Sequence, residues 1–168
     1  SFTAQEIWEL LPGERSKYVF TEAWYAGFDE FAGVKDEENQ FWMQLLEVRD
    51  NVNQALEQAR RNDAIGGSLQ AEVTLYADDA LAQKLSRLGD ELRFALLTSE
   101  ASVKPLSEAG DDAVKAEQLP LAVAVSASAH KKCERCWHHR EEVGTIAGHD
   151  DLCQRCVTNI DGAGEERR

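Results

Sequence analysis

Hydrophobic residues recur three or four positions apart in two stretches, residues 2–11 and 37–61, and this spacing predicts an amphipathic helix in each. In the first helix, Thr3 and Glu6 have the spacing of a capping box, and Pro12-Gly13 ends the helix. We expect Phe2, Ile7, Leu10 and Leu11 to face a core. The predicted apolar stripe of the second helix comprises Trp42, Leu45, Leu46, Arg49, Val52, Leu56 and Ala59.

Aromatic residues gather in the irregular segment 18–28, which follows the first helix. We expect Trp24 and Tyr25 to pin this segment onto a helix bundle, because large aromatic side chains pack in cores more often than they stack on bases. For Arg49, which lies on or beside the apolar stripe, an ion pair with a neighbouring helix is favoured over a contact with RNA.

Residues 65–129 show a different pattern, in which apolar and polar residues alternate in two stretches. Strands alternating with short helices indicate a small α+β domain. Residues 107–118 are rich in Gly and Asp, and we expect them to form an exposed, partly disordered loop. The predicted elements are a strand over 68–77, a helix capped by Asp78-Asp79, a helix over 90–97, and strands over 101–106 and 121–128.

The four cysteines of the chain stand in two Cys-x-x-Cys turns separated by sixteen residues. This is a zinc spacing, because each turn points two sulfurs to one side and two facing turns complete a tetrahedron around a metal at about 2.3 Å. Four thiolates leave no open coordination position, so the expected role is structural. The predicted ligands of one Zn²⁺ ion are Cys133, Cys136, Cys153 and Cys156.

Disulfides, redox chemistry and bound iron remain open as alternative roles for these cysteines but are less favoured. Two disulfides would require an oxidising compartment. A redox Cys-x-x-Cys motif would need only one of the two pairs. Rubredoxin-like iron is the third alternative, because thiolate sets also hold iron.

The chain has a net charge of −13, but this charge is distributed unevenly along the sequence. A strongly acidic chain disfavours nucleic acid as a partner. Residues 130–168, however, hold 7 basic and 8 acidic residues together with all four histidines. The cysteine segment is therefore the part of the chain that repels the phosphate backbone of a nucleic acid least.

Arg135 lies inside the first cysteine turn and Trp137 follows directly after it. An arginine and an aromatic ring on a rigid turn make a platform for an unstacked base, one by hydrogen bonding and the other by stacking. The alternative is that Trp137 covers the metal site as a small core, and the residues themselves leave both open. We expect His138, His139 and His149 to be surface residues, because four sulfurs already fill the coordination shell.

The remaining composition indicates a globular chain with 43% hydrophobic and 29% charged residues. No apolar run approaches the roughly eighteen residues of a membrane span, and no signal-peptide pattern is visible. No nucleophile elbow, P-loop or catalytic pair of carboxylates appears either. A helical pattern is already under way at Ser1, so we expect a piece of a longer chain.

Several motifs, taken in order, resemble the C-terminal part of bacterial isoleucyl-tRNA synthetases. The segment 1–8 is similar to the anticodon-binding helix bundle of class I synthetases for hydrophobic amino acids, and 45–60 to the last long helix of that bundle. Residues 65–71 resemble the join to a junction domain. Residues 132–138, together with the second cysteine turn, resemble the terminal zinc module that separates isoleucine enzymes from valine and leucine enzymes.

The resemblance implies a multidomain α and α+β fold with a bundle end over 1–64, a junction domain over 65–129 and a zinc module over 130–168. It implies that the full protein attaches isoleucine to tRNA(Ile) with ATP and edits misattached valine, using catalytic and editing domains upstream of these residues. It assigns RNA binding to Arg135 and Trp137 and implies a cytoplasmic monomer. A DNA glycosylase of the formamidopyrimidine type, which has a similar zinc finger, and a zinc-stapled protein-interaction module are the alternatives.

Overall fold

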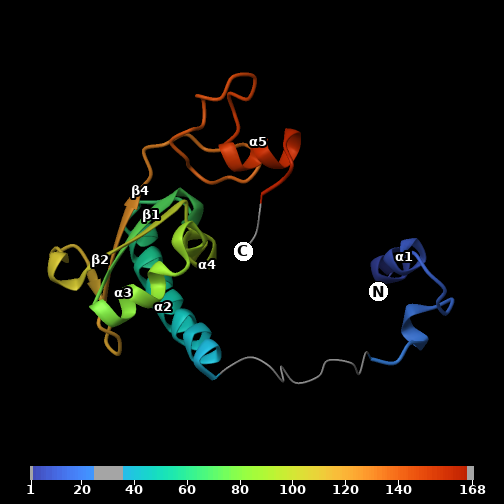
Figure 1. Cartoon of the computed structure of the whole chain (residues 1–168), viewed down its shortest axis with the longest axis horizontal. Coiled ribbons are helices and arrows are strands. Elements are labelled where there is room, and N and C mark those ends of the chain that lie inside the picture. Colours follow the sequence, from blue (N-terminus) through green and yellow to red (C-terminus); the bar gives the residue numbers. More distant parts are fainter. Residues whose placement is uncertain (1, 25–35, 166–168) are drawn as a thin grey trace. The chain divides into compact units, whose positions relative to one another are not determined.

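A computed structural model of the chain describes residues 2–24 and 36–165 (Figure 1). It divides into two compact units, Ser1–Asp36 and Glu37–Arg168. Among the described residues, no helix is long and apolar enough to cross a membrane.

The first unit contains helix α1 (Phe2–Leu10) and a short 3-10 helix (Val19–Thr21). The indole Nε1 of Trp8 donates to the carbonyl of Ser16 at 2.9 Å, which folds the segment after α1 back onto the helix. The helix prediction is confirmed, but α1 begins at Phe2, so Thr3 lies inside it and is not its cap.

Apolar side chains of the first unit lie on the surface of the described residues, which contradicts two predictions. None of the residues expected to face a core is buried, and no other residue of α1 is buried either. Trp24 is 98% exposed and so is not packed against the described residues of the unit, and Tyr25 lies outside those residues. A stretch this short has too few apolar groups to bury a helix face by itself.

The second unit is built around a four-stranded sheet of order β2-β1-β4-β3. Strand β1 pairs in parallel with β2 and antiparallel with β4, whose other edge pairs antiparallel with β3. In β1, buried and half-buried residues alternate strictly, as the sequence predicts for a strand with one covered face. The strands are β1 (Ala71–Ala77), β2 (Glu100–Pro105), β3 (Val114–Lys115) and β4 (Leu121–Ala127).

Helices α2, α3 and α4 share one hydrophobic core with the sheet (Figure 1). The Asp78 side chain caps α3 by accepting a hydrogen bond from the Leu81 amide at 2.9 Å, as predicted. The C-cap of helix α4 is Leu97, whose φ of 56° places it in the left-handed region. The helices are α2 (Asp36–Arg61), α3 (Asp79–Ser86) and α4 (Leu92–Leu96), with 3-10 turns at Ser68–Gln70, Gly89–Glu91 and Leu106–Glu108.

Helix α2 confirms the long helix, but its buried face is rotated from the predicted stripe. Trp42 and Leu46, both assigned to the stripe, are more than half exposed. Arg49 is half-buried and forms no ion pair with the described residues, so the expected pair with a neighbouring helix is absent there. The buried positions of α2 are Phe41, Leu45, Val48, Val52, Ala55 and Leu56.

The loop expected over 107–118 is partly structured, because Val114 and Lys115 form β3 against Val123 and Ala122. The two cysteine turns form a module with a core of its own, Cys133, Val143, Cys153 and Cys156, and with helix α5 (Gln154–Asp161). The predicted fold class, helical and α+β parts with a four-cysteine module, is confirmed. The domain bounds at 64/65 and 129/130 stay predictions; α2 packs in one core with the sheet.

Candidate metal centre and nucleic-acid interface

The four cysteine sulfurs converge on one point, all within 4.8 Å of one another. Cys136 Sγ and Cys153 Sγ, one from each turn, are 3.6 Å apart. A tetrahedral ion with bonds of about 2.3 Å would place its sulfurs about 3.8 Å apart, so the arrangement fits tetrahedral Zn²⁺ with little rearrangement. Among the described residues, no other group of histidines, cysteines or carboxylates converges in this way.

All four cysteines are free thiols in the structure, and the Cys136–Cys153 separation is far longer than the bond of about 2.05 Å in a disulfide. The structure therefore does not support the disulfide alternative.

The close approach of the sulfurs shifts the pKa values of three of the thiols. The hydrogen bond shared with Cys136, together with burial, raises the pKa of the Cys153 thiol, and burial raises the pKa of the Cys156 thiol. Only Cys136 among these three has a lowered pKa, because of its hydrogen bond with Cys153. Thiolates this close together repel one another, and the charge of a divalent ion would offset that repulsion as the thiols release their protons.

Two N–H donors, one from the backbone and one from a side chain, support the sulfurs. The Cys153 amide donates to Cys133 Sγ at 3.3 Å, and Arg135 Nη1 donates to Cys156 Sγ at 3.5 Å. This hydrogen bond raises the pKa of Arg135 further above its usual value. Cys153 is also the N-cap of α5, so both cysteines of the second turn lie at the positive end of that helix.

The first cysteine turn forms the tip of a short hairpin. Lys132 and His139 form a bridge across it, and the Cys133 amide donates to the carbonyl of His138 at 2.9 Å. The turn closes where the Trp137 amide donates to the carbonyl of Cys133 at 2.8 Å. Trp137 and Arg135 are therefore held at this tip by backbone hydrogen bonds and by the convergence of the sulfurs.

Trp137 is the most informative side chain of the tip. It is 61% exposed and takes no part in the module's core, whose other apolar members are Val143 and Leu152. Its φ of 67° lies in the left-handed region, where a side chain is strained and glycine is preferred. The alternative that Trp137 covers the metal site is therefore not supported. A large ring exposed on a strained backbone is typical of a residue kept for contact with a partner.

The histidines of the module do not all lie where the sequence suggests. His138 is buried, which contradicts the prediction that it is a surface residue. Burial and the charge of Arg93 lower its pKa, so the ring is neutral at neutral pH. His139 and His149 are half-buried, and His149 Nε2 lies 2.7 Å from a carboxylate oxygen of Asp161. None of the three belongs to the metal cluster, in agreement with the expectation that sulfur fills it.

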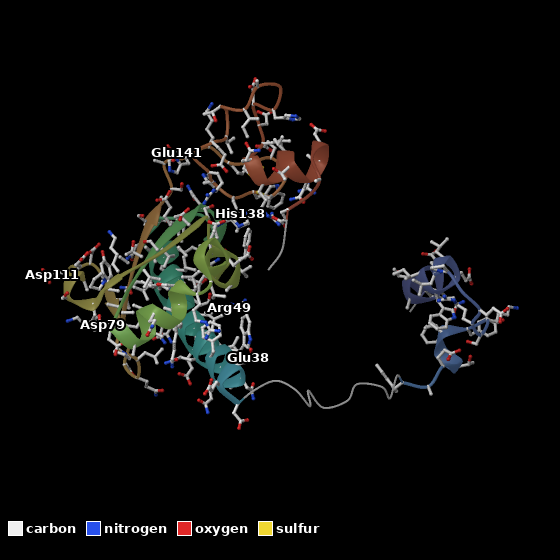
Figure 2. The ribbon with its side chains drawn as sticks, viewed as in Figure 1. Glu38, Arg49, Asp79, Asp111, His138 and Glu141 are labelled. Atoms are coloured by element: carbon white, nitrogen blue, oxygen red, sulfur yellow. The ribbon has the colours of Figure 1, made fainter. Side chains whose placement is uncertain are left out.

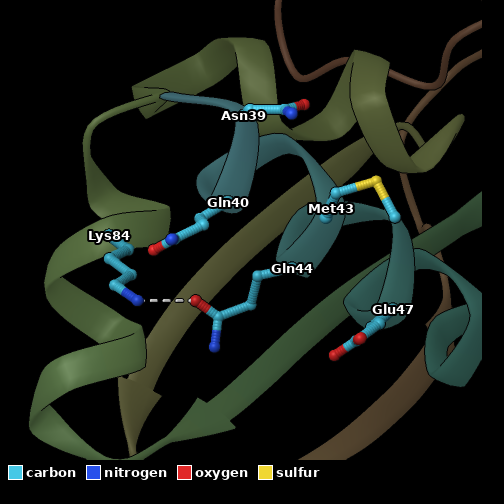
Figure 3. A pocket seen from close by; sticks show the side chains of 6 residues that line it. All are labelled: Asn39, Gln40, Met43, Gln44, Glu47 and Lys84. Carbon is cyan, nitrogen blue, oxygen red and sulfur yellow. Dashed lines mark hydrogen bonds between the residues drawn. The ribbon is translucent and has the colours of Figure 1, made fainter. Parts of the chain in front are cut away.

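Other hollows lie on the surface of the second unit, between its described residues. One, of about 330 Å³, lies between α2 and α3 (Figure 3), where Lys84 Nζ donates to Gln44 Oε1 at 2.8 Å. Its lining residues are Asn39, Gln40, Met43, Gln44, Glu47 and Lys84.

Comparison with known proteins agrees with this geometry. Residues 131–159 match the family described as "Zinc finger found in FPG and IleRS". Over all 168 residues the chain is 76% identical to the isoleucine–tRNA ligase of Idiomarina loihiensis, of which it covers 18%. It is 59% identical over 99% of its length to the isoleucine–tRNA ligase of Shewanella baltica, again 18% of that protein.

A further relative, the isoleucine–tRNA ligase of Shewanella putrefaciens, is 58% identical over the whole chain, which again covers 18% of the relative. The chain thus spans less than a fifth of the length of the curated relatives that it matches. Along its entire length the chain is therefore homologous to part of the isoleucine–tRNA ligases, and its four-cysteine module matches the zinc finger found in that family.

Proposed function

We propose that Cys133, Cys136, Cys153 and Cys156 hold one Zn²⁺ ion and that this ion has a structural role. The convergence of the four sulfurs on one point supports the proposal. When bound, the ion fixes the two turns and leaves no open position for a substrate. Contact with a partner is then left to the residues that are exposed on the two cysteine turns.

We further propose that the chain is the C-terminal, tRNA-recognising part of an isoleucine–tRNA ligase. The observation that carries this proposal is Trp137, exposed and strained at the tip of the cysteine hairpin beside the exposed Arg135. The ring offers a surface on which an unstacked anticodon-loop base can stack. Arg135 uses one N–H for Cys156, and its other donors remain available for a purine edge.

In the full protein, these residues would serve the attachment of isoleucine to tRNA(Ile) with ATP and the editing of misattached valine, both carried out by domains outside this chain. Residues 1–64 would be the end of the anticodon-binding bundle, 65–129 the junction domain and 130–168 the zinc module. The full protein would be a cytoplasmic monomer. The relatives support this assignment because each carries the name isoleucine–tRNA ligase and matches all or nearly all of the chain.

A tail of a DNA glycosylase is the second candidate, because the family that matches residues 131–159 is named for FPG as well as IleRS. The relatives disfavour it, because their similarity extends through residues 1–130 as well. The third candidate is a protein-interaction module held together by zinc, which would bind neither RNA nor DNA.

A mobility-shift assay on the zinc-loaded chain separates these candidates. The probes are tRNA(Ile), a tRNA for another amino acid, and duplex DNA with an oxidised base. Selective retardation of tRNA(Ile), lost in Trp137→Gly but kept in Ile160→Ala, supports the proposal. Ile160 is the matched control, because it is 50% exposed and apolar in the same module. Retardation of the damaged DNA alone, or of no probe, refutes the proposal.

A further inference from the structure

The zinc module and the α+β body have separate hydrophobic cores. Besides the connecting chain and a contact of 3.8 Å between His130 Nε2 and the Glu72 carboxylate, they are joined by polar and aromatic contacts between the segment 93–100 of the body and residues of the module. Contacts of this kind leave domains free to move unless they are specific. The orientation of the module therefore depends on a few identifiable side chains.

Ser99, directly before β2, is the buried centre of this joint, with 0% exposure. Its hydroxyl accepts a hydrogen bond from the His139 amide at 2.6 Å and donates to the carbonyl of Leu69. Arg140 Nη1 donates to the Ser99 carbonyl at 3.2 Å and to the Glu100 carboxylate at 2.5 Å. One buried hydroxyl thus links the module to two segments of the body. Removing this hydroxyl would leave the His139 amide and the Leu69 carbonyl without their partner, which would destabilise the contact between module and body.

Phe94, on α4, forms the aromatic half of the joint. The His138 ring meets it edge-on with centroids 5.4 Å apart, and the guanidinium of Arg155 lies 4.8 Å from its centroid. Both partners belong to the module, His138 after its first cysteine turn and Arg155 inside its second, and Figure 2 shows His138 where the module meets α4. Arg155 is itself held by Glu165, with Nη2 to Oε1 at 2.8 Å.

We propose that Ser99 and Phe94 are positioning residues, which lock the zinc module onto the α+β body and so present Arg135 and Trp137 to RNA in one orientation. The RNA part of this inference rests on the proposed function. RNA that meets the tip and a second surface of the chain binds more weakly if the two surfaces first have to be aligned, because alignment costs entropy. Neither residue needs to touch RNA for this effect.

The proposal that Ser99 and Phe94 hold the module on the body is tested without RNA. The protein used is the zinc-loaded chain that carries Phe94→Leu and Ser99→Ala together. Backbone ¹⁵N relaxation should give one tumbling time for body and module in the parent and a shorter time for the module in the variant. The matched control is Phe41→Leu with Ser102→Ala. Phe41 also lies under a guanidinium, that of Arg87 at 5.2 Å, and Ser102 donates to Thr74, but neither contacts the module.

The RNA part is tested by titrating the same proteins with tRNA(Ile). We expect the joint variant to raise Kd about five-fold or more with zinc content unchanged, and the control variant to leave Kd within two-fold. Restoring the hydroxyl, as Ser99→Thr, should recover part of the affinity. A single tumbling time in the joint variant, or a Kd within two-fold of the parent, overturns the inference. If the parent binds no tRNA, the proposed function fails, while the relaxation data still decide whether Ser99 and Phe94 hold the module.

Discussion

Trp137 combines a backbone conformation that suits glycine with the largest of all side chains. The left-handed region costs a non-glycine residue about 1–2 kcal/mol. Replacing Trp137 by Gly should therefore leave the free energy of unfolding of the zinc module unchanged or raise it by about 1 kcal/mol. The same change should weaken tRNA binding about ten-fold, because a base stacked on an aromatic ring contributes roughly 1–3 kcal/mol.

Denaturant unfolding and tRNA titration of zinc-loaded Trp137→Gly and Ile160→Ala measure both effects. Trp137→Ala gives a third comparison, because it removes the ring but keeps the strain. If both Trp137→Gly and Trp137→Ala unfold more readily than the parent, the ring packs the module and the proposed contact is wrong.

Arg135 has two roles to separate, because it donates to the Cys156 sulfur and is also exposed at the surface. Groups that support metal ligands typically affect metal affinity 10- to 100-fold. We expect Arg135→Ala to keep one zinc per chain but to lose it to a chelator at about ten-fold lower concentration than the parent. Arg135→Lys should retain zinc better than Arg135→Ala, yet should bind tRNA as poorly, because lysine cannot make the paired hydrogen bonds of arginine. Equal chelator resistance of Arg135→Ala and the parent would assign no supporting role to this side chain.

Among the elements, α5 and the cysteine hairpin depend on the metal centre. Helix α5 has eight residues, too few to be stable alone, and it begins directly after Cys153. Binding of zinc supplies on the order of 10–16 kcal/mol in small fingers. We therefore expect Cys153→Ser to unfold the module while α2 and the sheet remain folded, because their core is separate.

Amide NMR spectra report both parts in one experiment. In Cys153→Ser, signals of the module should collapse to unfolded positions while those of α2 and β1 stay dispersed. A chelator added to the parent should have the same effect. Dispersed signals from α5 in metal-free protein would show that zinc is not needed for this fold.

Local patterns predicted the elements whose causes are local. The alternation in β1 and the Asp78 cap follow from side-chain period and hydrogen bonding within a few residues. The two-residue strand β3 exists only because it pairs with β4, so its own composition gave no signal. Apolar residues occur on adjacent faces of α2, and contact with the sheet, which the sequence does not show, selects Val48 over Leu46.

For the candidate site, the cysteine spacing carried the prediction of the cluster, because ligand geometry ties spacing directly to structure. The burial of His138 could not be predicted, because it arises from Phe94, 44 positions away in the sequence. The left-handed backbone at Trp137 was equally hidden, because the turn that imposes it closes through the Cys133 carbonyl.

For the whole molecule, the absence of catalytic clusters among the described residues leads to a prediction about activity. The cysteine cluster is the one metal-binding group found there, and its four sulfurs leave no site for a substrate. We expect the 168-residue chain to show no isoleucine-dependent exchange of pyrophosphate into ATP. The assay is run with zinc-loaded chain beside a full-length isoleucine–tRNA ligase. Exchange above background by the chain alone would show that it contains an adenylating site.

In a full-length isoleucine–tRNA ligase that contains this chain, recognition of tRNA and activation of isoleucine should separate. Trp137→Gly and Arg135→Ala alter a surface held by the zinc module, whereas adenylate formation needs isoleucine and ATP but no tRNA. We therefore expect each variant to lower kcat/KM for tRNA charging about ten-fold, equivalent to about 1.4 kcal/mol of lost binding to the transition state, with pyrophosphate exchange unchanged. Both assays are run side by side on zinc-replete enzyme, with Ile160→Ala as the control. Charging within two-fold of the parent for both variants would mean that these side chains serve only the fold of the module, whereas a parallel loss of exchange would mean that the substitutions disturb the whole enzyme.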